Sequence, residues 1–159
     1  MSQEPNDPHS IGSSPSAAPH LDDAYRATSY LMFLPEYTVS VRIDEPARTL
    51  DDWLIRHSHK TWAFISAYNP LSQPLGDEEN RHRHQQLIER VESRQQSWYE
   101  GMGRPDRNDW KPEYGLFLPG IAKRDALALA KRFQQIALVF SQRGQPPQLI
   151  YTGLSKQEA

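Results

Sequence analysis

The apolar positions along the chain follow the two periods that are typical of strands and of helices. Residues 37–43 alternate apolar and polar side chains, which predicts a half-buried strand. Residues 62–67 are apolar at nearly every position and predict a central strand that is covered on both faces. Other apolar runs predict further strands, at residues 114–118, 136–140 and 148–151. A turn at 142–145 joins the last two into a hairpin.

Helical spacing between these strands predicts three helices. Thr49 and Asp52 resemble a capping box at the start of a helix that ends near residues 56–58. Asp77 is the expected N-cap of a second helix, which runs to about residue 93. Residues 125–134 are rich in Ala and Leu and predict the third. The apolar face of the second helix also carries polar residues at its beginning; that face contains Asn80, His84, Leu87, Ile88 and Val91.

In two further segments the spacing of apolar residues is less regular. Asp22 and Asp23 open a short helix, and residues 30–34 either extend it or begin a strand. Residues 98–111 contain glycines, a proline and many polar side chains, and are expected to form a loop. The order of elements predicts an α/β (α+β-like) fold. We expect a single mixed β-sheet of about five strands, packed with three to four helices and ending in a β-hairpin.

Composition sets the expected domain boundaries. Residues 1–20 are rich in Ser, Pro and Asn with little apolar content, which predicts a disordered N-terminal tail. Residues 21–153 are expected to form a single α/β domain, because this length can bury one core. Residues 154–159 are polar and are expected to be a frayed C-terminus.

Charge and residue content exclude several classes of protein. The 159 residues carry a formal net charge of −2 and no cysteine, so neither disulfides nor thiolate metal sites can form. A near-neutral charge does not favour nucleic acid as a partner. No apolar run reaches the about 18 residues of a membrane span, and the N-terminus lacks a secretory pattern. The sequence therefore predicts a soluble, cytoplasmic protein without membrane contact, and leaves its oligomeric state open.

Several separate motifs carry a resemblance to a known family. They occur in order at residues 66–72, 79–80, 110–113 and 126–137. Over roughly residues 25–151 the chain resembles DUF3293, a bacterial domain family of unknown function. The resemblance implies no activity, cofactor or partner. Residues 113–116 look like the Glu-x-Ser pattern of that family, with Gly115 where a Ser is usual.

The first candidate site is the loop that follows the predicted central strand. Asn69 and Ser72 lie in this loop, and Asn80 lies on the next helix. Ligands of open α/β sheets bind beyond the carboxyl ends of the strands. The acidic residues 77–79 oppose a phosphate there, and no Gly-rich phosphate loop is present. Two interpretations stay open: Asn69 contacts a ligand, or its side chain bonds the backbone within a turn.

The second candidate pairs Glu113 with Gln135. Glu113 opens a predicted strand, and Gln135 lies at a junction between a helix and a strand, where a buried polar group needs a partner. Glu113 could act as a general base or bind a hydroxyl or amino group. Alternatively, it is a surface carboxylate paired with an arginine such as Arg124.

Other chemistries find little support in the spacing. The histidines occur two residues apart, at 57 and 59 and at 82 and 84, a spacing at which helical side chains do not face each other. We therefore predict no metal and no cofactor. The chain also has no Gly-x-Ser-x-Gly nucleophile motif. The arginines of residues 81–107 alternate with acidic residues, which is typical of a solvated helix face.

Two hypotheses about function follow. In the first, the chain is a small-ligand-binding or enzymatic domain with a polar site at the strand ends; whether it is an enzyme is left open. Glu113 is its proton acceptor and candidate catalytic residue, and the ligand-binding residues are Asn69, Ser72, Asn80 and Gln135. These side chains must then converge on one pocket. In the alternative, the chain is a non-enzymatic interaction module that presents the aromatic and arginine residues of segment 98–110 to a protein or nucleic acid.

Overall fold

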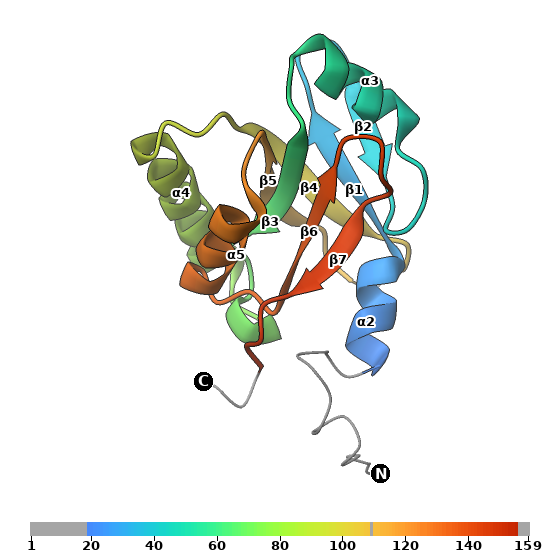
Figure 1. Ribbon diagram of the computed structural model, residues 1–159. Coiled ribbons are helices and arrows are strands. Elements are labelled where there is room, and N and C mark those ends of the chain that lie inside the picture. The colour runs from blue at the N-terminus through green and yellow to red at the C-terminus, as the bar shows by residue number, and fades with distance from the viewer. Residues whose placement is uncertain (1–18, 109, 156–159) are drawn as a thin grey trace.

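A computed structural model describes residues 19–108 and 110–155 (Figure 1). The predicted frayed end at 156–159 and most of the predicted disordered tail, residues 1–18, lie outside the described residues. Helix α2 (Pro19–Arg26) begins two residues inside the segment that was predicted as tail. Pro19 suits the start of a helix, because its missing N–H would have no helical partner there.

One seven-stranded sheet forms the centre of the molecule, in the order β2-β1-β4-β5-β3-β6-β7. Every pairing in it is antiparallel, so the prediction of a mixed sheet of about five strands is wrong in both respects. The predicted central strand is confirmed, since β3 lies between β5 and β6. The strands are β1 (Thr28–Phe33), β2 (Thr38–Val41), β3 (Thr61–Ser66), β4 (Tyr99–Pro105), β5 (Glu113–Pro119), β6 (Ala137–Gln142) and β7 (Gln148–Tyr151).

Strand β4 occupies the segment that was predicted as a loop, and β1 includes the segment that was left open. The glycines of β4 gave the misleading signal. A Cβ added at Gly101 would lie 2.4 Å from the carbonyl oxygen of Leu31 and 2.8 Å from the ring of Phe64. The residue is therefore a glycine because a neighbouring ring packs onto the strand there, which is a recognised use of glycine within sheets.

Four helices of the described part pack on the sheet. Helices α4 (Asp77–Ser93) and α5 (Lys123–Arg132) cover one face, while α3 (Arg48–Arg56) and α2 lie on the other side (Figure 1). None of the helices described is both long and apolar enough to cross a membrane.

Both predicted N-caps are wrong by one or two residues. Ala47 is the N-cap of α3, and no side chain bonds that helix end, so Thr49 lies inside the helix. Gly76 is the N-cap of α4, and its N–H donates to Oε1 of Glu79 at 3.3 Å. Asp77 is thus the first helical residue, where its charge complements the helix dipole.

The sheet separates two apolar cores. On the side of α4 and α5 the core includes Leu87 and Leu116, which are fully buried. On the other side, Trp53 of α3 packs against Phe117 with their ring centroids 5.6 Å apart. Helix α3 covers only part of this second face. The remainder, toward the end of β3, is where a cavity opens.

Candidate functional site

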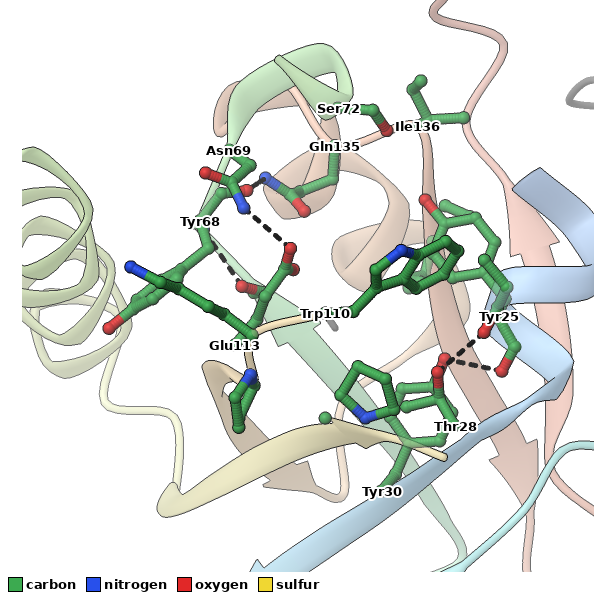
Figure 2. A pocket seen from close by; sticks show the side chains of 18 of the residues that line it. Tyr25, Thr28, Tyr30, Tyr68, Asn69, Ser72, Trp110, Glu113, Gln135 and Ile136 are labelled. Carbon is green, nitrogen blue, oxygen red and sulfur yellow. Dashed lines mark hydrogen bonds between the residues drawn. The ribbon is translucent and has the colours of Figure 1, made fainter. Parts of the chain in front are cut away.

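A cavity of about 600 Å³ lies on the second face of the sheet, between α2 and the loop that follows β3 (Figure 2). This size is ordinary for a small-molecule pocket. The side chains that the sequence analysis gathered into one candidate site all line it; they are Asn69, Ser72, Asn80, Glu113 and Gln135.

The loop after β3 is held in shape by two interlocked asparagines. The N–H of Asn69 donates to Oδ1 of Asn80 at 2.9 Å, and Nδ2 of Asn80 donates to Oδ1 of Asn69 at 2.9 Å. Oδ1 of Asn69 also accepts the N–H of Leu75 at 3.0 Å. Asn69 has φ of 49°, a left-handed conformation that Asn tolerates well. Asn69 therefore bonds the backbone, as one interpretation predicted, and lines the cavity as well.

Glu113 reaches the cavity from the first position of β5. Nδ2 of Asn69 donates to Oε2 of Glu113 at 2.8 Å. Burial raises the pKa of this carboxyl, and the hydrogen bond from Asn69 offsets only part of the rise. The alternative pairing with Arg124 is wrong, because that side chain is 92% exposed and its nearest carboxylate is Asp125.

Gln135 is buried at the junction between α5 and β6. Its Nε2 donates to the carbonyl oxygens of Tyr68, at 3.0 Å, and of Phe133, at 3.2 Å. The preceding Gln134 has φ of 58°, which turns the chain sharply out of the helix. The carboxamide oxygen of Gln135 points toward the Glu113 side of the cavity (Figure 2). The amide thus ties the two loops of the site together through its donors and presents its acceptor.

Ser72 lies beside the phenol of Tyr25 on α2. Burial raises the pKa of Tyr25, the charge of Glu113 raises it further, and a hydrogen bond with Ser72 lowers it in part. The phenol consequently stays protonated at physiological pH. Tyr30 behaves in the same way, because burial raises its pKa and its hydroxyl donates to the carbonyl oxygen of Tyr25 at 3.2 Å.

Aromatic rings form much of the cavity wall, and the sequence analysis missed them. They are Tyr25, Tyr30, Phe64, Tyr68 and Trp110. For two of them the signal is the two-residue repeat of side-chain direction along a strand, which places Tyr30 and Phe64 on the same face of the sheet. That inference required the strand order, since β1 and β3 are separated by β4 and β5.

Arg83 of α4 was also misjudged, as part of a solvated helix face. Its Nε donates to the carbonyl oxygen of Ala67 at 2.6 Å, and its Nη2 to that of Phe133 at 2.5 Å. The guanidinium therefore holds the end of β3 against the end of α5. Both segments lead directly into the cavity, at Tyr68 and at Gln135.

The remaining candidates do not form a second site. Nε2 of His84 lies 2.9 Å from Oε1 of Glu100, and no group of three or more side chains suited to a metal occurs among the residues that the structure describes. Trp98 is half-buried and packs against the core beneath α4 and α5. Trp110 is 44% exposed, lines the cavity and lies 5.7 Å from the guanidinium of Arg107. The two tryptophans thus belong to different faces of the sheet.

Fold and site together define the class of protein. It is an α+β domain whose single antiparallel sheet has, at the end of its central strand, a cavity lined by polar side chains and aromatic rings. The family model DUF3293, described as a protein of unknown function, matches residues 65–138. The chain is similar to this family over that matched part, which is narrower than the resemblance at 25–151 but contains all five predicted polar residues. Neither the curated proteins nor the solved structures gave a match to the chain.

Proposed function

We propose that the chain binds a small organic molecule in the cavity between α2 and the loop after β3. The observation that carries this proposal is the convergence of five polar side chains, from three separate parts of the chain, on one cavity with apolar walls. Few polar groups within an apolar enclosure are typical of small-molecule sites, because the walls supply binding energy and the polar groups supply orientation.

Glu113 is the group through which such a site would act on its ligand. It is half-buried, and its pKa is raised by that burial. A carboxylate whose pKa moves toward neutrality is a better proton acceptor near physiological pH than an ordinary surface carboxylate. In this role Asn69 orients the carboxylate, and Asn80 holds Asn69 in place. An enzymatic version of the proposal uses Glu113 as its general base.

The alternative, an interaction module built on segment 98–110, has less support. Tyr99–Pro105 is strand β4 in the interior of the sheet, and both of its edges are paired, with β1 and with β5. Within the described part of this segment, Trp110 is the large apolar side chain that remains exposed. A partner surface would need a contiguous patch, and one ring does not provide it.

A thermal-shift screen with nucleotides, amino acids, amines and other small metabolites tests the proposal. A ligand that binds the folded state raises Tm by mass action, whatever its chemistry. The matched variant is Gly103→Leu. A Cβ at Gly103 would be in ordinary contact, 3.6 Å from Thr28 and Tyr30, and Gly103 itself lines the cavity, so the longer side chain is designed to fill part of it.

The expected result is at least one compound that raises the Tm of the native protein and leaves that of Gly103→Leu unchanged. The variant must keep its native circular dichroism spectrum and its own Tm for the comparison to hold. Compounds that stabilise both proteins equally would bind elsewhere. A screen in which every hit behaves in that way contradicts the proposal.

A further inference from the structure

Among the charged side chains that line the cavity, one carboxylate is directed to its interior. Asp77 and Lys111 lie at the rim, where Nζ of Lys111 is 3.4 Å from Oδ1 of Asp77 and both side chains are largely exposed. Glu113 is the remaining charged residue of the described lining, and no arginine or histidine accompanies it. The interior of the cavity therefore carries negative charge and repels anions.

Several hydrogen-bond donors of the cavity are already used by the protein. Both N–H groups of the Gln135 amide donate to backbone carbonyls, and Nδ2 of Asn80 donates to Asn69 and to the carbonyl of Leu75. The hydroxyls of Thr28 and Tyr30 likewise donate to backbone carbonyls. Beside these occupied donors, the carboxylate of Glu113 and the carboxamide oxygen of Gln135 offer acceptors to a molecule that supplies donors.

The cavity is also lined by aromatic rings. Rings from α2, β1, β3, the loop after β3 and the segment before β5 line the same cavity as the carboxylate; they are Tyr25, Tyr30, Phe64, Tyr68 and Trp110. Because Tyr25 and Tyr30 stay protonated, their rings are neutral and present the negative face of an aromatic quadrupole. Rings around a carboxylate form the environment in which organic cations are bound.

We propose that the ligand of this cavity is a small organic cation, a primary ammonium on a flat apolar body, with Glu113 as its counter-charge. The ammonium donates to Glu113 and to the carboxamide oxygen of Gln135, and the apolar body stacks among the rings. This inference rests on the proposed function, since it names the chemical class that the same cavity selects. Binding also supplies the opposite charge that the half-buried carboxylate lacks among the described residues.

Binding of such a cation is linked to protonation of Glu113. The ammonium pairs with the ionised carboxylate, so its affinity is greatest above the pKa of Glu113 and falls as the pH drops through it. That pKa lies above 4.5 in the free protein. The bound cation in turn favours ionisation, and binding at a pH near this pKa releases protons.

The test uses three probes of matched shape and different charge: 2-phenylethylamine, 2-phenylethanol and phenylacetate. Calorimetric titration at about pH 8 measures their affinities for the native protein, for Glu113→Gln and for Glu89→Gln. Glu113→Gln keeps an oxygen that accepts the Asn69 hydrogen bond but removes the charge. Glu89 is exposed on α4, away from the cavity, and controls for the loss of one negative charge from the molecule.

We expect the amine to bind about tenfold or more tightly than the alcohol, and phenylacetate to bind weakest. Glu113→Gln should bring the amine to the affinity of the alcohol, while Glu89→Gln leaves it unchanged. Equal binding of amine and alcohol, with both lost in Gly103→Leu, would contradict the proposal that the ligand is a cation. The cavity would still be a ligand site. If the amine does not bind, the proposal of a cationic ligand is contradicted as well. The proposed function is then tested by the thermal-shift screen alone.

Discussion

Glu113 is an ionisable side chain of the cavity lining that the protein partly buries. Its carboxylate is half-buried, is bonded by Asn69 and carries a raised pKa because burial penalises the charged form. A group with a raised folded-state pKa stabilises the fold most at low pH. This contribution is lost as the pH rises from the unfolded value of about 4.5 through the folded one.

Substitution of this residue tests that linkage. Glu113→Gln retains the acceptor for Asn69 and cannot ionise. The difference between the Tm of the variant and that of the native protein should therefore increase in favour of the variant as the pH rises from 4 to 8. Thermal denaturation at each pH measures it. A difference in Tm that stays constant across this range would show that the carboxyl is not desolvated. Glu89→Gln, which removes an exposed carboxylate of α4, is the control for the loss of one negative charge.

Gly115 lies at a point of the sheet that has no room for a side chain. A Cβ there would lie 2.6 Å from the ring of Phe64 and 2.8 Å from the carbonyl oxygen of Ile65. The Phe64 ring thus occupies the space of the missing side chain. Gly115→Ser should cost about 1–3 kcal/mol of the free energy of unfolding, measured in urea, because it overpacks this point.

The cause of that loss can be checked in a double-mutant cycle. Phe64→Leu removes the ring atoms closest to position 115 but leaves the backbone contact. The serine should therefore cost less in the Phe64→Leu background than in the native one. Additive effects would mean that the ring is not what excludes a side chain at this position.

At the scale of elements, Arg83 joins three segments whose ends form the cavity. Its guanidinium donates from α4 to the end of β3 and to the end of α5. A lysine ammonium lacks the planar fork that reaches two carbonyls at once. Arg83→Lys should lower the free energy of unfolding by about 1–3 kcal/mol. Arg81→Lys, an exposed change on the same helix, should lie within about 0.5 kcal/mol of the native value.

The interlock between the loop and α4 gives a second prediction at this scale. Asn80→Ala leaves the N–H of Asn69 without its acceptor and removes one donor from Oδ1 of Asn69. Because these groups are part-buried, we expect a loss of about 1–3 kcal/mol in urea denaturation. Gln86→Ala, at an exposed position of the same helix, is the control. A loss no greater than that of the control would mean that the two asparagines do not define the loop.

The polar part of the site was predictable from sequence, and the apolar part was not. Asn69 and Asn80 follow a strand with a clear pattern, so their place at the strand end was apparent. The residues next to Arg83 in the sequence do not indicate its role, because its partners are backbone carbonyls distant in the chain. Strand β4 was hidden by its glycines, of which Gly101 lies against the Phe64 ring and the Leu31 carbonyl oxygen of other strands. Such tertiary packing overrides local propensity.

At the scale of the whole molecule, the sheet is sealed on the face of α4 and α5 and partly open on the other. Strand β3 is paired on both edges and buried on both faces. Its amides at Ala63 and Ile65 should exchange hydrogen most slowly, and those of the edge strands β2 and β7 faster, by native-state exchange. Faster exchange in β3 than in β7 would contradict this order.

The most direct test of the account is the position of a bound ligand. Isotope-filtered nuclear Overhauser spectra of the protein with the strongest hit of the thermal-shift screen would report which protons it contacts. We predict contacts with the methyl groups of Ala137 and Leu149 and with the ring of Tyr30, all of which line the cavity. Contacts confined to the exposed side chains of Phe33, Tyr37 and Ile55 would contradict the assignment of the cavity as the binding site.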